Sequence, residues 1–184
     1  DTEVISNDWL SDLVGIASQP SVGCVGAKLL YDDLSIQHAG VIMGLGGYAA
    51  HSHRGLENEH AGYFNRSHVT QNLSAVTAAC LAITKEAYWS VNGLDEAFEV
   101  AYNDVDFCLR VNKKGFQNIY CATSVLYHYE SKSRGLDISI EKQLRFDREK
   151  ALLLSRWPEV IDSDPFYSPH LTRSAENFTI RKDY

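Results

Sequence analysis

Residues 102–110 have the sequence YNDVDFCLR, in which two acidic residues, Asp104 and Asp106, are separated by one residue. They predict the start of a helix with Asn103 or Asp104 as the N-cap, where an acid suits the positive end of the helix dipole. Asp106 and Arg110 are four residues apart and predict an ion pair along one helix face. Asp104 would then lie at the open end of the helix, fixed in place yet accessible to a ligand. Such a carboxylate can act as a general base, although two acids that merely cap a surface helix would give the same pattern.

The composition indicates one globular domain. The 184 residues are enough to bury a hydrophobic core, and 45% hydrophobic and 22% charged residues are ordinary proportions. The net charge of -7 argues against nucleic-acid binding, which needs a basic surface, and suits a domain that uses a cation to hold an anionic ligand. The four cysteines lie far apart in the sequence, so we expect buried free thiols. Free thiols indicate a reducing compartment, either the cytoplasm at large or the inner face of the membrane.

The hydrophobic pattern alternates between helical and strand periods, which predicts an α/β fold. Predicted helices cover residues 7–18, 85–91 and 137–155, in addition to the one that begins near residue 103. On the last of these, the residues 137–155, those predicted to face inward are Ile140, Leu144, Ala151 and Leu152. Predicted strands cover residues 22–30, 36–43, 80–83, 118–121 and 124–129.

Residues 44–71 show no periodic pattern. An irregular segment of this length inside a compact domain is more often functional than filler, so we expect a mobile, polar loop that faces a substrate. His51 and His53 raise the alternative of a structural zinc site. No cysteine or second histidine pair stands at ligand spacing, which disfavours zinc.

A further group of polar residues follows the last predicted strand. His128 ends that strand, and Ser131, Ser133 and Arg134 come directly after it. These residue types supply a metal ligand, hydroxyl donors and a cation that binds phosphate. A single histidine is more often a hydrogen-bonded core residue than a ligand, so both interpretations of His128 stay open.

Together these motifs resemble family 2 glycosyltransferases, and are similar to those of bacterial rhamnosyltransferase-like enzymes. The resemblance is carried, in order, by DTEV from residue 1, VGAKL from 25, QHAG from 37, SAVT from 74, GLDE from 93, NDVD from 103 and HYES from 128. It implies the GT-A fold, a Rossmann-like mixed sheet flanked by helices. It also implies that residues 1–184 are the C-terminal two-thirds of one catalytic domain, truncated at the N-terminus, and the start without methionine agrees with a piece of a longer protein.

The resemblance also implies roles for individual residues. Asp104 matches the catalytic base of an inverting transfer, in which an acceptor hydroxyl attacks the anomeric carbon of a nucleotide-diphosphate sugar of the UDP or dTDP type. Asp1 and His128 match ligands of Mn²⁺ or Mg²⁺, which neutralises the departing diphosphate. The acceptor would be a glycan or a lipid-linked glycan. The donor-phosphate residues would be Ser131, Ser133 and Arg134, and the acceptor-side residues Asn103, Asp106 and His38.

Two departures from the family pattern matter. The glutamate usual before the base is Asn103 here, so no acid role passes to it. Residues 153–157, LLSRW, keep the Arg-Trp of the Q-x-x-R-W motif of processive synthases but not its glutamine, which argues against a polymerising enzyme.

The alternatives are a non-catalytic carbohydrate-binding domain and an inert half-domain. If the nucleotide-binding half precedes Asp1, strands beside residues 25–29 would be missing. We therefore expect an exposed apolar sheet edge or face there. We also expect this chain by itself to bind UDP or dTDP sugars weakly, to show no transferase activity and to self-associate.

Overall fold

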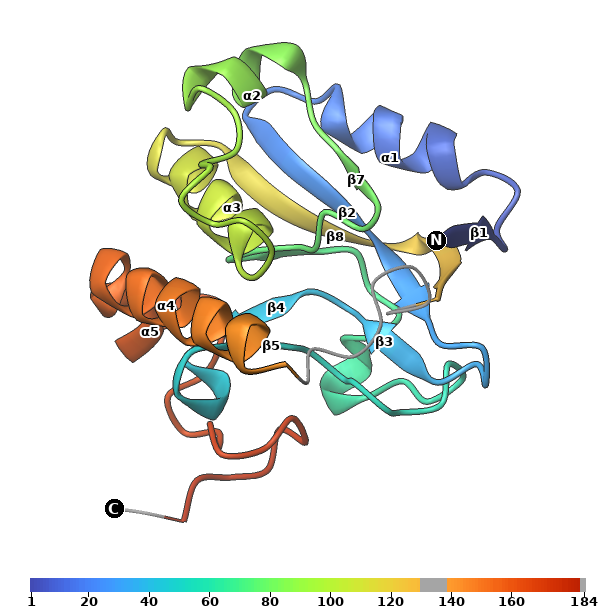
Figure 1. Cartoon of the computed structure of the whole chain (residues 1–184). Coiled ribbons are helices and arrows are strands. Elements are labelled where there is room, and N and C mark those ends of the chain that lie inside the picture. Colours follow the sequence, from blue (N-terminus) through green and yellow to red (C-terminus); the bar gives the residue numbers. More distant parts are fainter. Residues whose placement is uncertain (130–138, 183–184) are drawn as a thin grey trace.

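The computed structural model describes residues 1–129 and 139–182 and has an α/β architecture, with a curled mixed sheet flanked by helices (Figure 1). Its helices are α1 (Trp9–Ala17), α2 (Lys85–Ser90), α3 (Asn103–Lys113), α4 (Ile140–Arg156) and α5 (Pro158–Asp162), with 3₁₀ turns η1 (Leu45–Gly47) and η2 (Tyr63–Asn65). Its strands are β1 (Thr2–Val4), β2 (Val22–Leu30), β3 (Ile36–His38), β4 (Val41–Met43), β5 (Ala49–His51), β6 (Gln71–Leu73), β7 (Leu81–Ala82) and β8 (Gln117–His128). This architecture is compatible with a Rossmann-like fold.

The parallel strands β2 and β8 form the centre of the six-stranded sheet. β1 and β6 pair antiparallel with the two ends of β8, and β3 and β7 pair antiparallel with β2. β2 has neighbours on both sides, and all nine of its residues are buried. The exposed sheet edge or face expected at residues 25–29 is therefore wrong.

The two faces of β2 contribute to two different parts of the core. Val25, Ala27 and Leu29 pack with Leu13 of α1, whereas Cys24 and Leu30 belong to the cluster that includes α3. This division follows from the alternation of side chains along a strand. Figure 1 shows the result, with α1 on one side of the central strands and α3 on the other.

Gly26 faces the α3 side and makes a close contact that only glycine allows. A Cβ atom at Gly26 would lie 2.5 Å from Cβ of Val76, too close for two carbon atoms. The segment that leads to Thr77 therefore passes directly over β2. This contact is one reason why the small residues around Val76 come near the sheet.

The predicted strand 36–43 is broken into two strands that belong to different sheets. β3 pairs with β2, whereas β4 pairs with β5 in a separate two-stranded sheet. The chain turns at Gly40, whose φ of +93° is a conformation that glycine adopts readily. A Cβ atom there would also lie 1.9 Å from Cδ1 of Leu73.

Residues 118–121 and 124–129 were predicted to form two strands, but the structure has one continuous strand there, β8. Its pairing with β2 shifts register between Cys121 and Val125. The extra residues are held by α1, because Thr123 donates a hydrogen bond to Asp12 and Ser124 donates one to the Trp9 carbonyl. The polar residues that suggest a break in the sequence thus mark a bulge in a continuous strand.

Helix α4 begins at Ile140, after Ser139, which accepts a hydrogen bond from the backbone N–H of Lys142. Residues 137 and 138 of the predicted helix lie outside the described residues. The inward face also differs from the expected one, because Ile140 and Leu144 are exposed and Leu153 is buried. No helix of the described part of the chain is both long and apolar enough to cross a membrane.

Residues 44–71 are less irregular than predicted. They contain β5 and two 3₁₀ turns, and bury Ser52, His53 and Ser67. The Lys28 ammonium, on the buried strand β2, donates to the carbonyl of Asn58 at 3.3 Å and so ties the loop to the sheet. Burial lowers the pKa of Lys28, and nearby Glu59 partly offsets this effect. The loop is thus attached to the core at several points.

Candidate active site

Asp104 lies in the first turn of α3, but the helix starts differently from the prediction. The N-cap is Tyr102, in the left-handed conformation with φ of 60°, so neither Asn103 nor Asp104 is the cap. The Asn103 side chain instead accepts a hydrogen bond from the backbone N–H of Asp104 at 2.7 Å. Both residues remain half-buried at the open end of the helix.

Three hydrogen bonds hold the Asp104 carboxylate in one orientation. Its Oδ1 accepts from the backbone N–H of Val105 at 2.8 Å. Its Oδ2 accepts from the Thr77 hydroxyl at 2.9 Å and from the backbone N–H of Ala78 at 3.0 Å. Asp104 is therefore fixed both by its own helix and by the segment that crosses β2.

Thr77 also connects Asp104 to His38. The backbone N–H of Thr77 donates to Nε2 of His38 at 3.3 Å. His38 is completely buried on β3, so it reaches Asp104 only through Thr77. Burial, and then the neighbouring rings of His51 and His128, hold the pKa of His38 well below its usual range. The ring is therefore neutral, and because Nε2 accepts, its proton is on Nδ1.

His128, at the end of β8, lies near the first residues of the chain. It pairs with Thr2 across the β1–β8 ladder, and the backbone N–H of Tyr129 donates to the Asp1 carbonyl at 2.9 Å. On its other side, Nδ1 of His128 lies 2.6 Å from Oε1 of Gln37, which reaches it from β3. The structure thus brings the backbones of Asp1 and His128 close together, but the residue paired with His128 is Thr2, so Asp1 is one position out of register with it.

His51 joins the same cluster from the loop, although it was considered in the sequence only as a zinc ligand. Its Nδ1 lies 3.0 Å from the backbone carbonyl of Gln37, and its ring meets the edge of His38 with centroids 4.8 Å apart. His53, two residues on, stacks instead on Phe178 at 4.5 Å. The two histidines of the loop therefore belong to different surroundings. Within residues 1–129 and 139–182, no three side chains are arranged to hold a metal ion.

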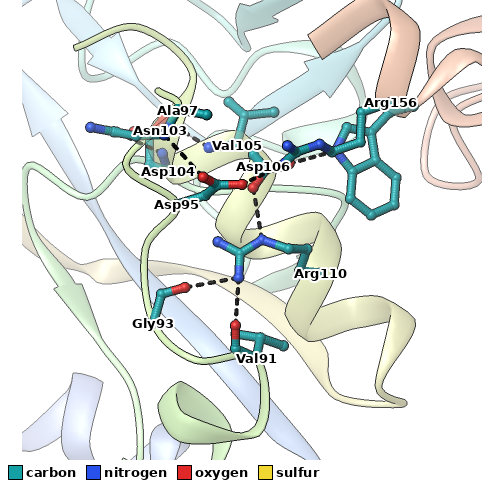
Figure 2. A network of polar contacts seen from close by, with 11 residues as sticks. Val91, Gly93, Asp95, Ala97, Asn103, Asp104, Val105, Asp106, Arg110 and Arg156 are labelled. Carbon is teal, nitrogen blue, oxygen red and sulfur yellow. Dashed lines mark hydrogen bonds and ion pairs between the residues drawn. The ribbon is translucent and has the colours of Figure 1, made fainter. Parts of the chain in front are cut away.

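Asp106 points toward Arg110 and Arg156, as Figure 2 shows. It is completely buried, and its Oδ2 accepts from Arg110 at 2.7 Å, which confirms the predicted ion pair. Its Oδ1 accepts from Arg156 and from Nε1 of Trp157, each at 2.9 Å. Arg156 also pairs with Asp95 at 2.7 Å. Asp106 thus fastens α3 to the end of α4, and its acceptor-side role stays a prediction.

Three residues of the site had no role in it predicted from the sequence, namely Gln37, Thr77 and His51. Gln37 and Thr77 lie inside the QHAG and SAVT motifs, but their partners are far away in the sequence, at His128 and Asp104. No local spacing predicts such contacts. The predicted phosphate-binding residues Ser131, Ser133 and Arg134 lie outside the described residues.

Comparison with known proteins gives relatives that are much longer than this chain. No family model and no solved structure matches it. The chain is 49% identical over 98% of its length to "Uncharacterized protein y4gI" of Sinorhizobium fredii, and 36% identical over 99% to "O-antigen biosynthesis protein RfbC" of Myxococcus xanthus. These matches cover 20% and 14% of the two relatives. A segment of 62 residues is 29% identical to N-acetylglucosaminyl-diphospho-decaprenol L-rhamnosyltransferase of Mycobacterium tuberculosis, covering 34% of this chain and 20% of that enzyme.

Proposed function

We propose that this chain is part of a glycosyltransferase that moves a sugar from a nucleotide-diphosphate sugar, of the UDP or dTDP type, to a hydroxyl of a glycan or lipid-linked glycan. Two relatives support this class by their names, one an O-antigen biosynthesis protein and the other a rhamnosyltransferase. Synthesis of a cell-surface polysaccharide at the cytoplasmic side of the membrane is part of the proposal. So are membership of family 2 and the GT-A fold, with which a mixed sheet flanked by helices is compatible.

The observation that carries the proposal is the immobilised carboxylate of Asp104. It is half-buried at the open end of α3 and held by Thr77, Ala78 and Val105. A general base needs this combination of fixed position and access to a ligand, because proton transfer requires hydrogen-bond contact with the attacking hydroxyl. Asp104 would take the proton of the acceptor hydroxyl as that oxygen attacks the anomeric carbon. A single attack on the face opposite the leaving diphosphate inverts the configuration of that carbon.

A divalent cation, Mn²⁺ or Mg²⁺, is also part of the proposal. Asp1 and His128 would hold it, and their backbones lie close together where β1 begins and β8 ends. Two protein ligands are enough where substrate phosphates supply other ligands, as they commonly do for Mg²⁺. The bound cation would neutralise negative charge on the departing diphosphate. Ser131, Ser133 and Arg134 remain the proposed donor-phosphate residues.

The decisive experiment compares Asp104→Asn with wild type in the full-length protein. A panel of UDP and dTDP sugars would be tested for release of the nucleoside diphosphate with Mn²⁺ present. We expect the wild type to turn over one of these donors and Asp104→Asn to lose roughly 10²–10⁴-fold in rate, while still binding the donor. Asp8→Asn, which makes the same change at the exposed N-cap of α1, is the matched control.

The same experiment tests the alternative of a non-catalytic carbohydrate-binding domain. A binding domain would release no nucleoside diphosphate, and Asp104→Asn would leave its sugar affinity unchanged. Turnover by Asp104→Asn at the wild-type rate would remove Asp104 from the mechanism.

A further inference from the structure

Gln37 is the residue that joins the histidines of the candidate site. It lies on β3 with only 2% of its surface exposed. Its side chain makes two contacts with His128, Oε1 to Nδ1 at 2.6 Å and Nε2 to the backbone carbonyl oxygen at 3.2 Å. Its backbone carbonyl makes a third contact, to Nδ1 of His51 at 3.0 Å. One buried residue thus contacts two imidazole rings.

The two contacts with His128 fix the orientation of the Gln37 amide. The backbone carbonyl oxygen of His128 can only accept, so the amide nitrogen of Gln37 must face it. The amide oxygen then faces Nδ1 of His128. Since an amide oxygen also only accepts, Nδ1 must carry a proton. The neutral His128 ring therefore keeps its lone pair on Nε2.

The same argument applies to His51 with a different atom of Gln37. Its Nδ1 faces the backbone carbonyl of Gln37, which accepts and cannot donate. Nδ1 of His51 is therefore protonated, and the neutral ring keeps its lone pair on Nε2. His38, whose Nε2 accepts from Thr77, has the same arrangement of protons. All three rings of the cluster are thus in one tautomer.

We propose that Gln37 is a positioning residue of this site, which holds His128 in the Nδ1–H tautomer so that Nε2 can coordinate a divalent cation. A ligating imidazole in proteins commonly has its other nitrogen fixed by such a hydrogen bond, and the partner tunes metal affinity. The role toward a cation rests on the proposed function, whereas the tautomer does not. Gln37 acts on His128 through its side chain and on His51 through its backbone, which allows the two effects to be separated.

The test is long-range ¹H–¹⁵N NMR of the seven histidines at pH 8, with resonances assigned from single histidine substitutions. In the wild type we expect His51 and His128 both to show the Nδ1–H pattern. In Gln37→Met, His128 should shift toward the Nε2–H form that free imidazole side chains favour. His51 should keep its pattern, because its partner is a backbone atom, and this makes it an internal control for the fold.

Gln37→Glu is the conservative variant, since a carboxylate still accepts from Nδ1. It should restore the Nδ1–H pattern of His128. An Nε2–H pattern for His128 in the wild type, or an unchanged His128 pattern in folded Gln37→Met, would overturn the proposal. Should Gln37→Met not fold, the wild-type and Gln37→Glu spectra still decide between the two tautomers.

A titration with Mn²⁺ alone separates this inference from the proposed function. Paramagnetic broadening of His128 should appear in the wild type, and Gln37→Met should need about 10–100-fold more Mn²⁺ for the same broadening. Broadening at equal Mn²⁺ in both proteins would overturn the positioning role. No broadening in the wild type, with the tautomers as expected, would refute the metal assignment of His128 and with it Gln37's role toward a cation.

Discussion

The Thr77 hydroxyl donates to Oδ2 of Asp104 over 2.9 Å, while the backbone N–H of the same threonine donates to His38. One residue on the segment that crosses β2 therefore orients the proposed base and also binds the buried histidine behind it. This contact joins positions 27 residues apart in the sequence.

Thr77→Val removes the hydroxyl while keeping the shape of the side chain. We expect kcat of the full-length enzyme to fall roughly ten- to hundredfold, because a catalytic group that is slightly misplaced loses much of its effect. KM for the donor should change little. Thr77→Ser restores the hydroxyl and should recover most of kcat. Equal rates in the valine and serine variants would show that the hydroxyl does not position Asp104.

Arg156→Met tests the contact between α3 and α4. Asp106 has no exposed surface and depends on Arg110, Arg156 and Trp157 for its hydrogen bonds. Removing one donor from a buried charge should lower the free energy of unfolding by about 1.5–3 kcal/mol, measured by urea denaturation. The control is Arg148→Met, which breaks an exposed ion pair with Glu99 and should cost about 1 kcal/mol at most. Similar losses in the two variants would contradict this account.

The lowered pKa of His53 predicts that the folded protein loses stability in mild acid. Burial, and then the positive charges of Arg66, Lys28 and His60, lower its pKa from 6.5 to about 4. Between these pH values the unfolded chain binds a proton at His53 that the folded chain does not, so stability falls as pH falls. The shift corresponds to about 3 kcal/mol at most.

Denaturation at several pH values between 7 and 4 measures this effect. The variant His53→Asn should show a shallower loss of stability, and asparagine tolerates the positive φ of 60° at this position. The variant His170→Asn, at an exposed histidine, is the control. His38, whose pKa is also lowered by burial, should keep part of the slope in every variant. An identical slope in His53→Asn would exclude His53 as a source.

The exposed edge strand β1 predicts that the chain self-associates. Among the residues that the structure describes it pairs with β8 alone, its three residues are exposed, and Val4 retains 46% of its surface. Such an edge can pair with another chain, and a lysine on an edge strand opposes this. Light scattering should show concentration-dependent association that Val4→Lys reduces. Val69→Lys, at a position with similar exposure in a loop, should not reduce it. A monomer at every concentration would contradict the prediction.

The elements that the sequence predicted well are those whose pattern is local. The run from Val22 to Leu30 is apolar because it is buried on both faces, and the observed strand has the predicted bounds. The spacing of Asp106 and Arg110 on one helix was likewise enough to predict their ion pair.

The failures depend on contacts between distant residues. The break at Gly40 follows from the proximity of Leu73, which no local pattern reveals. Helix α4 buries Glu149 because that carboxylate accepts hydrogen bonds from the backbone N–H groups of Glu99 and Ala101. The apolar residues Ile140 and Leu144 were a poor guide to its inward face for this reason.

In the candidate site, too, the sequence predicted what depends on a local pattern and missed what depends on contacts between distant residues. Asp104 stood out because an acid at the start of a helix is a recognisable local signal. Gln37 and Thr77 could not be assigned roles, because each acts on a side chain that only the folded chain brings near. Long-range hydrogen bonds therefore supply most of what the sequence could not predict.

The central pairing of the sheet has a consequence for how the chain folds during synthesis. β2 pairs in parallel with β8, so Val25 must wait for Ile119 before its strand is complete. The nearby strand β3 can pair with β2 much earlier, because only a short turn separates them. Pairing between distant segments is slow, and an apolar strand that waits for its partner is prone to aggregate. On the ribosome, β2 therefore stays without its central partner until β8 has been synthesised.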